Sequence, residues 1–213
     1  MIEDRKILLV EGTDDEHVMK HLFGTRIGRH IDEISAQQGI EKLIANLPVH
    51  FKRKGIGTIG IIVDADTDLV SRWRMITNAL IRRGYEHVPE SPVPMGTIVE
   101  RPSGSLLPRA GIWLMPDNQT TGILENFLQS FLPRESTLVE YVKQCVANIP
   151  DKKFRSSDES KALIHTWLAW QENPGLPFGS AITAGFLNPM CPQADSFIVW
   201  LRNLFFPGDF SGD

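Results

Sequence analysis

The sequence predicts an α/β fold, in which a mostly parallel sheet is flanked by helices and followed by a helical C-terminal extension. Three observations predict this fold. Short, continuous apolar runs recur along the first half of the chain, and such runs are typical of strands buried on both faces. Segments with helical spacing of apolar residues separate the runs, and this alternation favours parallel strands joined by right-handed crossovers. After Pro133 the strand-like runs stop, and only helical patterns follow.

The strongest strand candidates are two aliphatic runs, Lys6 to Val10 and Thr58 to Val63. A third apolar run lies at residues 112–115, immediately before a proline. The stretch 89–108 contains five prolines, so it is predicted to be a loop with one short strand at most. We expect strands at residues 6–10, 31–36, 58–63, 97–99 and 112–115.

The helices are predicted from apolar residues spaced three and four apart, together with glycine or proline stop signals. Gly24 is expected to end the first helix, and Pro48 is expected to lie just past the second. Trp170 and three other tryptophans are expected to pack between the sheet and the C-terminal helices. We expect helices at residues 14–23, 40–47, 73–81, 123–131, 138–147, 158–170 and 194–205. Residues 1–132 would form the α/β domain, and residues 133–213 a helical part packed on it.

The composition is that of a globular chain, with 213 residues and a net charge of −4. No apolar run approaches the roughly 20 residues that span a bilayer, so no membrane partner is expected. The acidic N-terminus does not resemble a signal peptide, and Cys145 and Cys191 are too few for a disulfide framework. These features predict a cytoplasmic protein. The net charge does not favour binding of nucleic acid by charge alone, and basic pairs such as Arg72 and Arg74 are interpreted as solvated faces.

Acidic residues follow the two strongest predicted strands. Glu11 comes directly after the first strand, Asp64 ends the later one, and Asp66 follows two residues on. Parallel strands end at the same edge of a sheet, where open α/β sheets bind their ligands. Asp15, in the first turn of the next helix, would face the same crevice. Crowded carboxylates repel one another, and oxygen ligands without His or Cys favour Mg²⁺ or Mn²⁺.

Helix capping is an alternative interpretation of these acids. Helix N-termini attract carboxylates, so Asp64, Asp66 and Asp68 would cap the helix that follows them. Asp14 and Asp15 would do the same for the earlier helix. Two acidic strand ends at one sheet edge favour a metal site over capping alone.

The two motifs resemble the Toprim domain of topoisomerases, bacterial primases and related nucleases. Leu8-Leu9-Val10-Glu11-Gly12 matches its hydrophobic strand ending in Glu-Gly, and Ile61-Ile62-Val63-Asp64-Ala65-Asp66 matches its later strand ending in Asp-x-Asp. The resemblance covers about residues 5–125. It implies a Toprim-like sheet in which Glu11, Asp64 and Asp66 bind Mg²⁺ or Mn²⁺. It also implies that Glu11 acts in catalysis, as a general acid or base in the topoisomerase members.

Within that group the chain looks closest to OLD-type nucleases and small stand-alone Toprim-like proteins. Those nucleases carry an acid four residues after the first Glu, a later helical Glu and a downstream Lys. Asp15, Glu125 and Lys161 fit these features, and Asp117 is a candidate to join Glu125 around a second ion. OLD proteins join this domain to an ATPase, but the chain lacks a Gly-x-x-x-x-Gly-Lys-Ser/Thr loop. A separate ATPase partner is therefore implied.

The resemblance implies metal-dependent phosphoryl transfer, with cleavage of DNA or RNA phosphodiesters as the activity. Two alternatives stay open. A non-catalytic regulatory or binding module could retain the same fold. A haloacid-dehalogenase-like phosphatase also ends a strand in Asp-x-Asp, as in Asp64-Ala65-Asp66, although its expected Thr is here Asp68.

Overall fold

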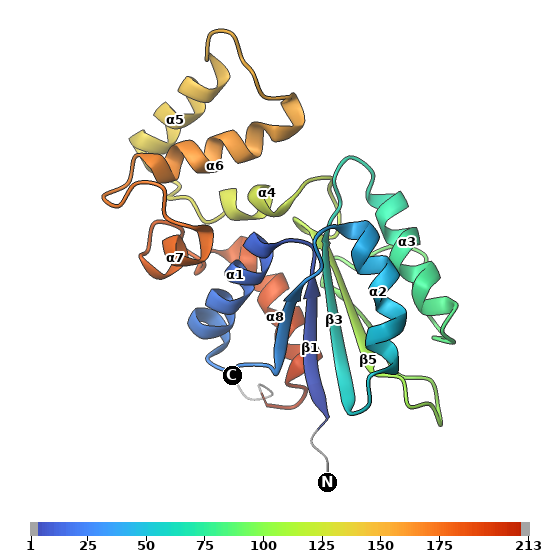
Figure 1. Ribbon diagram of the computed structural model, residues 1–213. Coiled ribbons are helices and arrows are strands. Elements are labelled where there is room, and N and C mark those ends of the chain that lie inside the picture. The colour runs from blue at the N-terminus through green and yellow to red at the C-terminus, as the bar shows by residue number, and fades with distance from the viewer. Residues whose placement is uncertain (1–3, 210–213) are drawn as a thin grey trace.

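The computed structural model describes residues 4–209, which form an α/β fold built on one five-stranded sheet (Figure 1). The strand order is β2-β1-β3-β5-β4, and neighbouring strands are parallel except for β4 and β5. The predicted fold class is confirmed, with a strand at each expected position. The strands are β1 (Arg5–Val10), β2 (Glu33–Ala36), β3 (Ile56–Asp64), β4 (Thr97–Val99) and β5 (Arg109–Met115).

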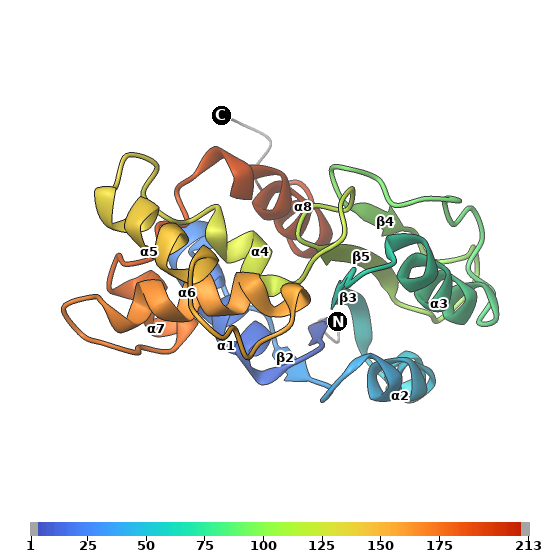
Figure 2. The same ribbon diagram turned by 90° about the horizontal axis from the view of Figure 1, so that it is seen from above.

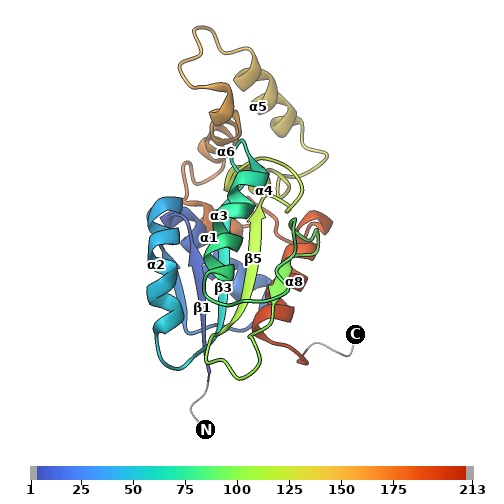
Figure 3. The same cartoon turned by 90° about the vertical axis from the view of Figure 1, so that its right-hand side faces the viewer.

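Different helices cover the two faces of the sheet because side chains alternate along each strand. Ile7 and Leu9 of β1 pack in one core with α2 and α3. Leu8 and Val10 pack in the other core with α1 and α8. Figure 3 shows α2 and α8 on opposite sides of the strands. The covering helices are α1 (Thr13–Leu22), α2 (Ile40–Lys52), α3 (Leu69–Ile81) and α8 (Asp195–Phe205).

Helix α8 lies directly against the centre of the sheet because two paired strand residues are glycines. Gly60 of β3 pairs with Gly111 of β5. A Cβ at Gly111 would lie 2.3 Å from Cδ2 of Leu204, and one at Gly60 would lie 2.8 Å from Cζ of Phe205. Larger side chains would push the helix away from the strands. The last helix of the chain therefore shares one core with the first strands.

Helices α4, α5 and α6 lie beyond the carboxyl ends of the strands (Figures 1 and 3), and α7 lies beside α1 (Figure 1). Seen from above (Figure 2), α4, α5 and α6 lie over the α1 side of the sheet, away from α2 and α3. Helix α6 contacts both α4 and α5, whereas α7 packs on α1. No helix within residues 4–209 is long and apolar enough to cross a lipid bilayer. These helices are α4 (Leu124–Gln129), α5 (Thr137–Ala147), α6 (Glu159–Ala169) and α7 (Phe178–Thr183).

One predicted helix end was wrong, and another was confirmed, because α1 ends at Leu22 close to Gly24. Helix α2 continues through Pro48 to Lys52. The proline removes one backbone hydrogen bond, but the extra turn buries Phe51 to 6% exposure, and that burial offsets the loss at least in part. After α1 the chain forms a π-helical turn through Gly24, and it ends at Gly28, whose φ of 70° suits glycine.

Two features of the C-terminal part were also predicted wrongly. Helix α7 lies where a Pro- and Gly-rich turn was expected. It forms in contact with α1, where a Cβ at Gly179 would lie 2.4 Å from Cδ2 of His21. Trp170 is 42% exposed instead of packed on the sheet, and its ring lies 5.7 Å from that of Tyr141. Both outcomes depend on long-range packing, which local periodicity does not encode.

Candidate functional site

The ends of β1 and β3 bring Glu11 and Asp64 together. The two strands are parallel neighbours, and Val10 pairs with Ile62, so the residues that follow them lie at the same edge of the sheet. The backbone amide of Asp64 donates a hydrogen bond to Oε2 of Glu11 at 3.2 Å. Burial raises the pKa of Glu11, although that hydrogen bond and the nearby Arg72 guanidinium oppose the rise.

Asp15 contributes a buried carboxylate from the first turn of α1. The residue is only 6% exposed. Its Oδ2 accepts a hydrogen bond from the amide of Gly12 at 3.0 Å, whereas its Oδ1 has no hydrogen-bond partner within residues 4–209. Burial raises the pKa of Asp15 to about 7, and the charges of Glu11 and Glu125 add to this effect. A buried carboxylate oxygen without a donor destabilises the ionised form unless a proton or a cation joins it.

Asp64 lies at the centre of a group of five carboxylates that influence one another. Burial raises the pKa of Asp64 to about 8, and repulsion from the four other carboxylates adds to this effect. Its Oδ1 accepts a hydrogen bond from the backbone amide of Leu124 at 2.9 Å, so Asp64 caps α4 from across the sheet edge. The group, called the acidic cluster below, consists of Glu11, Asp15, Asp64, Asp66 and Glu125.

Asp66 occupies a tight turn after β3 and pairs with a cation. Its φ is 50°, and its amide donates a hydrogen bond to the carbonyl of Gly122 at 2.8 Å. Its Oδ2 accepts a hydrogen bond from Nη2 of Arg72 in an ion pair. Asp68 is the residue that caps α3, because its Oδ1 accepts the amide of Ser71 at 2.9 Å. The capping alternative is therefore confirmed for Asp68, and also for Asp15, whose Oδ2 accepts the amide of the N-cap residue Gly12 of α1, whereas Asp66 is directed to Arg72.

Glu125 of α4 and Lys161 of α6 lie within electrostatic reach of each other. Glu125 is 8% exposed, and burial raises its pKa, while the charges of Lys161 and His165 oppose the rise. The adjacent residues join the two helices, because Nδ2 of Asn126 donates a hydrogen bond to Oγ of Ser160 at 2.8 Å. Packing of α6 on α4 thus brings a cation from a distant part of the sequence to the acidic cluster.

Asp117 interacts within its own turn. Its Oδ1 accepts hydrogen bonds from the amides of Gln119 at 2.9 Å and Thr120 at 2.7 Å, and from the hydroxyl of Thr120 at 3.0 Å. These contacts stabilise the turn between β5 and α4. A role for Asp117 beside a second ion stays a prediction.

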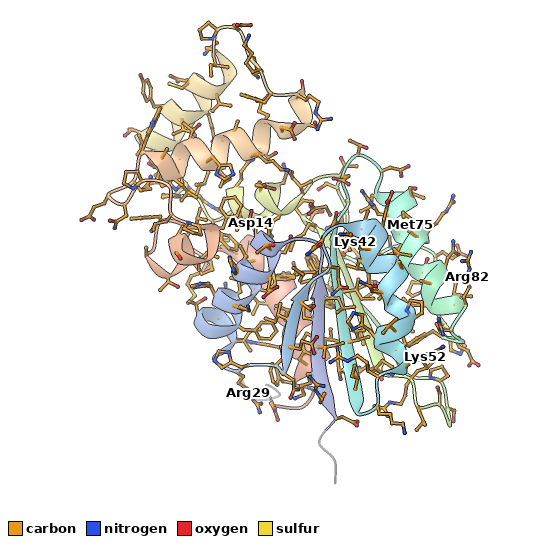
Figure 4. All side chains as sticks on the ribbon, in the orientation of Figure 1. Asp14, Arg29, Lys42, Lys52, Met75 and Arg82 are labelled. Atoms are coloured by element: carbon orange, nitrogen blue, oxygen red, sulfur yellow. The ribbon has the colours of Figure 1, made fainter. Side chains whose placement is uncertain are left out.

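A cleft of about 740 Å³ opens beside Asp66 and Lys161. It lies between α3, the turn before α4 and the start of α6, and Arg72 and Arg155 also line it. Figure 4 labels Met75, a further lining residue on α3, at the end of the sheet toward which the strands point. An apolar pocket of about 540 Å³ lies apart from these acids, between α5 and α6. Three cations, Arg72, Arg155 and Lys161, and three carboxylates, Asp66, Asp68 and Asp158, thus line the cleft, and Asp66 is the member of the acidic cluster among them.

The carboxylates of the cluster mostly hold protein partners. Glu11 and Asp64 accept backbone amides, and Asp66 pairs with Arg72. Within residues 4–209, no three His, Cys, Asp or Glu side chains are already arranged as a metal cage. A bound ion would therefore require these side chains to turn away from their present partners.

Comparison with protein-family models gives one match. The family described as "Protein of unknown function (DUF3226)" matches residues 5–206. The chain belongs to this family. No curated protein and no solved structure matches the chain. The matched range contains the whole acidic cluster and the cleft beside it, so both features belong to the DUF3226 region. The family description states no activity, and the resemblance to Toprim domains stays a prediction.

Two cations of this DUF3226 site were not predicted from the sequence. Arg72 was interpreted with Arg74 as a solvated face, but its side chain is only 18% exposed and pairs with Asp66. A signal was available, because α3 starts directly after the acidic turn and its first-turn side chains must lie near that turn. Arg155 reaches the cleft through the segment between α5 and α6, for which the sequence contains no comparable signal.

Proposed function

We propose that this protein is a metal-dependent phosphoryl-transfer enzyme that cleaves phosphodiester bonds of DNA or RNA. The observation that carries the proposal is the acidic cluster, in which Asp15 keeps a buried oxygen without a hydrogen-bond donor within residues 4–209. Burial raises the pKa of Asp64, and repulsion from the other carboxylates raises it further. Folding keeps these like charges together at a cost in stability, and a divalent cation would remove that cost.

The donor set fits Mg²⁺ or Mn²⁺. The acidic cluster offers hard carboxylate oxygens and no sulfur or imidazole donor, which disfavours zinc. Glu11, Asp64 and Asp66 would hold the ion with help from Asp15, and Asp117 with Glu125 would serve a second one. The ion would lower the pKa of a bound water and neutralise charge that develops on the phosphate.

The remaining chemistry would come from side chains around the cluster. The Lys161 ammonium would stabilise negative charge on the phosphate in the transition state. Glu11 is an alternative general acid or base, because burial raises its pKa toward the range in which proton transfer is efficient near neutral pH. Both roles require a substrate in the cleft that Lys161 lines.

The cleft offers cations to a polyanionic substrate despite the net charge of −4, although the same number of carboxylates also lines it. Arg72, Arg155 and Lys161 line the cleft, and guanidinium and ammonium groups bind phosphate oxygens. Bound metal would offset the acids beside them. We further infer a cytoplasmic location and a separate ATPase partner, both carried over from the sequence.

A cleavage assay tests the proposal. Purified protein is incubated with plasmid, single-stranded DNA and RNA, with Mg²⁺ or Mn²⁺ and then with EDTA. Cleavage of a polymer that stops in EDTA is the expected result. Phosphate release from a small monoester such as p-nitrophenyl phosphate, with no cleavage of any polymer, would overturn the nuclease and favour the phosphatase.

Inactivity on every substrate would favour the regulatory or binding module. The same assay with added candidate ATPases then separates that module from an enzyme that needs its partner. Binding of Mn²⁺ is measured in parallel by calorimetry, because a metal-dependent enzyme must bind the ion even when its partner is absent.

A further inference from the structure

Arg72 joins the acidic cluster to the cleft. Its Nη2 donates a hydrogen bond to Oδ2 of Asp66, and its charge opposes the rise that burial causes in the pKa of Glu11. Its side chain is 18% exposed, compared with 40% for the Asp66 side chain. Arg72 also lines the cleft together with Lys161. One guanidinium therefore lies both against a predicted metal ligand and against the space where a substrate would bind.

The ion pair is not what holds the turn in place. The Asp66 backbone is fixed by its amide, which donates to the carbonyl of Gly122 at 2.8 Å. Helix α3 is held by its Asp68 cap and by Trp73, which is 2% exposed in the core. The Arg72 side chain can therefore change partners without disturbing the fold around it.

We propose that Arg72 exchanges its carboxylate partner for a substrate phosphate when metal binds. In the metal-free protein it neutralises Asp66, and it thereby competes with a divalent cation for that carboxylate. When a cation takes Asp66, the guanidinium is repelled by the ion and turns to a phosphate oxygen in the cleft. This inference rests on the proposed function and adds to it a residue that couples metal binding to substrate binding.

The surroundings of Arg72 favour a phosphate as the second partner of its guanidinium. A guanidinium binds phosphate through two parallel hydrogen bonds. Lys161 and Arg155 line the opposite wall of the cleft, and Arg155 is partly neutralised by Asp158 at 3.2 Å. A phosphate between α3 and α6 would thus meet Arg72 from α3 and Lys161 from α6, in a cleft that carboxylates also line.

Manganese affinity, measured by calorimetry on the metal-free protein, tests the first half of the exchange. Arg72→Gln removes the competing charge, so Mn²⁺ should bind about three- to tenfold more tightly than in wild type. Arg74→Gln is the matched control, because Arg74 is exposed on the same helix and loses the same charge. If Arg72 merely supported Asp66, its loss would weaken Mn²⁺ binding. An unchanged or weaker affinity overturns the exchange.

Oligonucleotide affinity tests the second half. A fluorescein-labelled single-stranded phosphorothioate DNA, which resists cleavage, is titrated at saturating Mn²⁺ and followed by anisotropy. Arg72→Gln should weaken its binding about tenfold or more, whereas Arg74→Gln should change it less than threefold. Equal losses in the two variants would show that only general charge matters and would overturn the proposal.

Arg72→Lys provides a variant that keeps the positive charge. It should bind Mn²⁺ as wild type does and bind the oligonucleotide about threefold more weakly, because the paired donors are lost. Unchanged oligonucleotide binding in this variant would also contradict the exchange. The experiments distinguish a failure of the proposed function from a failure of this inference. If the wild-type protein binds no Mn²⁺, both are overturned. If the wild-type protein binds Mn²⁺ and cleaves nucleic acid, but Arg72→Gln has the same affinities for Mn²⁺ and for the oligonucleotide, this inference alone is overturned.

Discussion

Acidic residues at opposite ends of the sheet have opposite environments. Glu33 begins β2 and pairs with Arg5 at 3.2 Å and Arg53 at 2.8 Å. The hydrogen bond from Arg53 is the main reason that the pKa of Glu33 is lowered. At the other end, burial among carboxylates raises the pKa of Asp15 to about 7 and that of Asp64 to about 8. Two arginines neutralise Glu33 at one end of the sheet, whereas at the other end one arginine, Arg72, pairs with one of five neighbouring carboxylates.

The opposite pKa shifts at the two ends of the sheet indicate which acids stabilise the folded state. A carboxylate between two guanidinium groups stabilises the folded state modestly at any pH at which it is ionised. A group of buried carboxylates does the reverse, and proteins tolerate such groups chiefly at functional sites. The carboxyl ends of the strands therefore merit the functional tests, and Glu33 is a control of the same residue type on the same sheet.

The largest expected effect separates Glu11 from Glu33. Glu11→Gln should lower metal-dependent cleavage about a hundredfold or more, because it removes both a predicted metal ligand and a predicted acid or base. Glu33→Gln should leave cleavage within about twofold, because its contacts lie at the other end of the strands. Steady-state rates on a nucleic-acid substrate measure both. Equal activity of wild type and Glu11→Gln would contradict a catalytic acidic cluster.

Lys161→Ala tests the cation that α6 contributes. We expect cleavage to fall about tenfold to a hundredfold, because the ammonium would stabilise charge in the transition state. Affinity for Mn²⁺ should stay near that of wild type, since Lys161 influences Glu125 without a direct ion pair like the one that joins Arg72 to Asp66. Cleavage rates and calorimetry together show whether the variant loses activity without losing affinity for Mn²⁺. If a loss of affinity for Mn²⁺ accounted for the whole loss of cleavage rate, Lys161 would support the structure of the metal site and would have no role in the transition state.

Asp15→Asn tests the cost of the acidic cluster in metal-free protein. The pKa of Asp15 is raised from 3.8 to about 7, so the folded state keeps a proton that the unfolded state releases between about pH 4 and pH 7. The free energy of unfolding should therefore fall as the pH rises through that window. Asn carries no charge, so at pH 8 the variant should be more stable than wild type by up to about 4 kcal/mol, which is about three pKa units at about 1.4 kcal/mol each, and at pH 4 it should be similar. Urea unfolding in EDTA measures this, and a less stable variant at pH 8 would support a purely structural Asp15.

Glu33→Gln should show the smallest effect, and its sign is opposite. The lowered pKa of Glu33 means that its ion pairs stabilise the fold above an ordinary pKa of 4.5 and lose this contribution as the pH falls below it. The variant should lose about 0.5 kcal/mol at pH 7, because the pairs are partly exposed, and almost nothing near pH 3. Urea unfolding of wild type and Glu33→Gln at pH 7 and pH 3 measures these differences in the free energy of unfolding. A loss of stability at pH 3 as large as that at pH 7 would show that packing, and not charge, is lost.

The parallel sheet and the meeting of Glu11 with Asp64 could be predicted from the sequence. Apolar runs identify strands locally, and the connection rules for parallel strands then place both strand ends at one edge. The positions of Glu11 and Asp64 just after those runs were enough to bring them together. Neither step needs knowledge of how the helices pack.

Tertiary packing decided the partners of the other residues. Asp66 and Asp68 belong to one acidic run, yet Asp66 pairs with Arg72 and Asp68 caps α3, because the left-handed turn at Asp66 separates their directions. Lys161 reaches Glu125 only because α6 packs on α4. A sequence pattern specifies which face of an element is buried, whereas the pairing of distant side chains follows from how whole elements pack together.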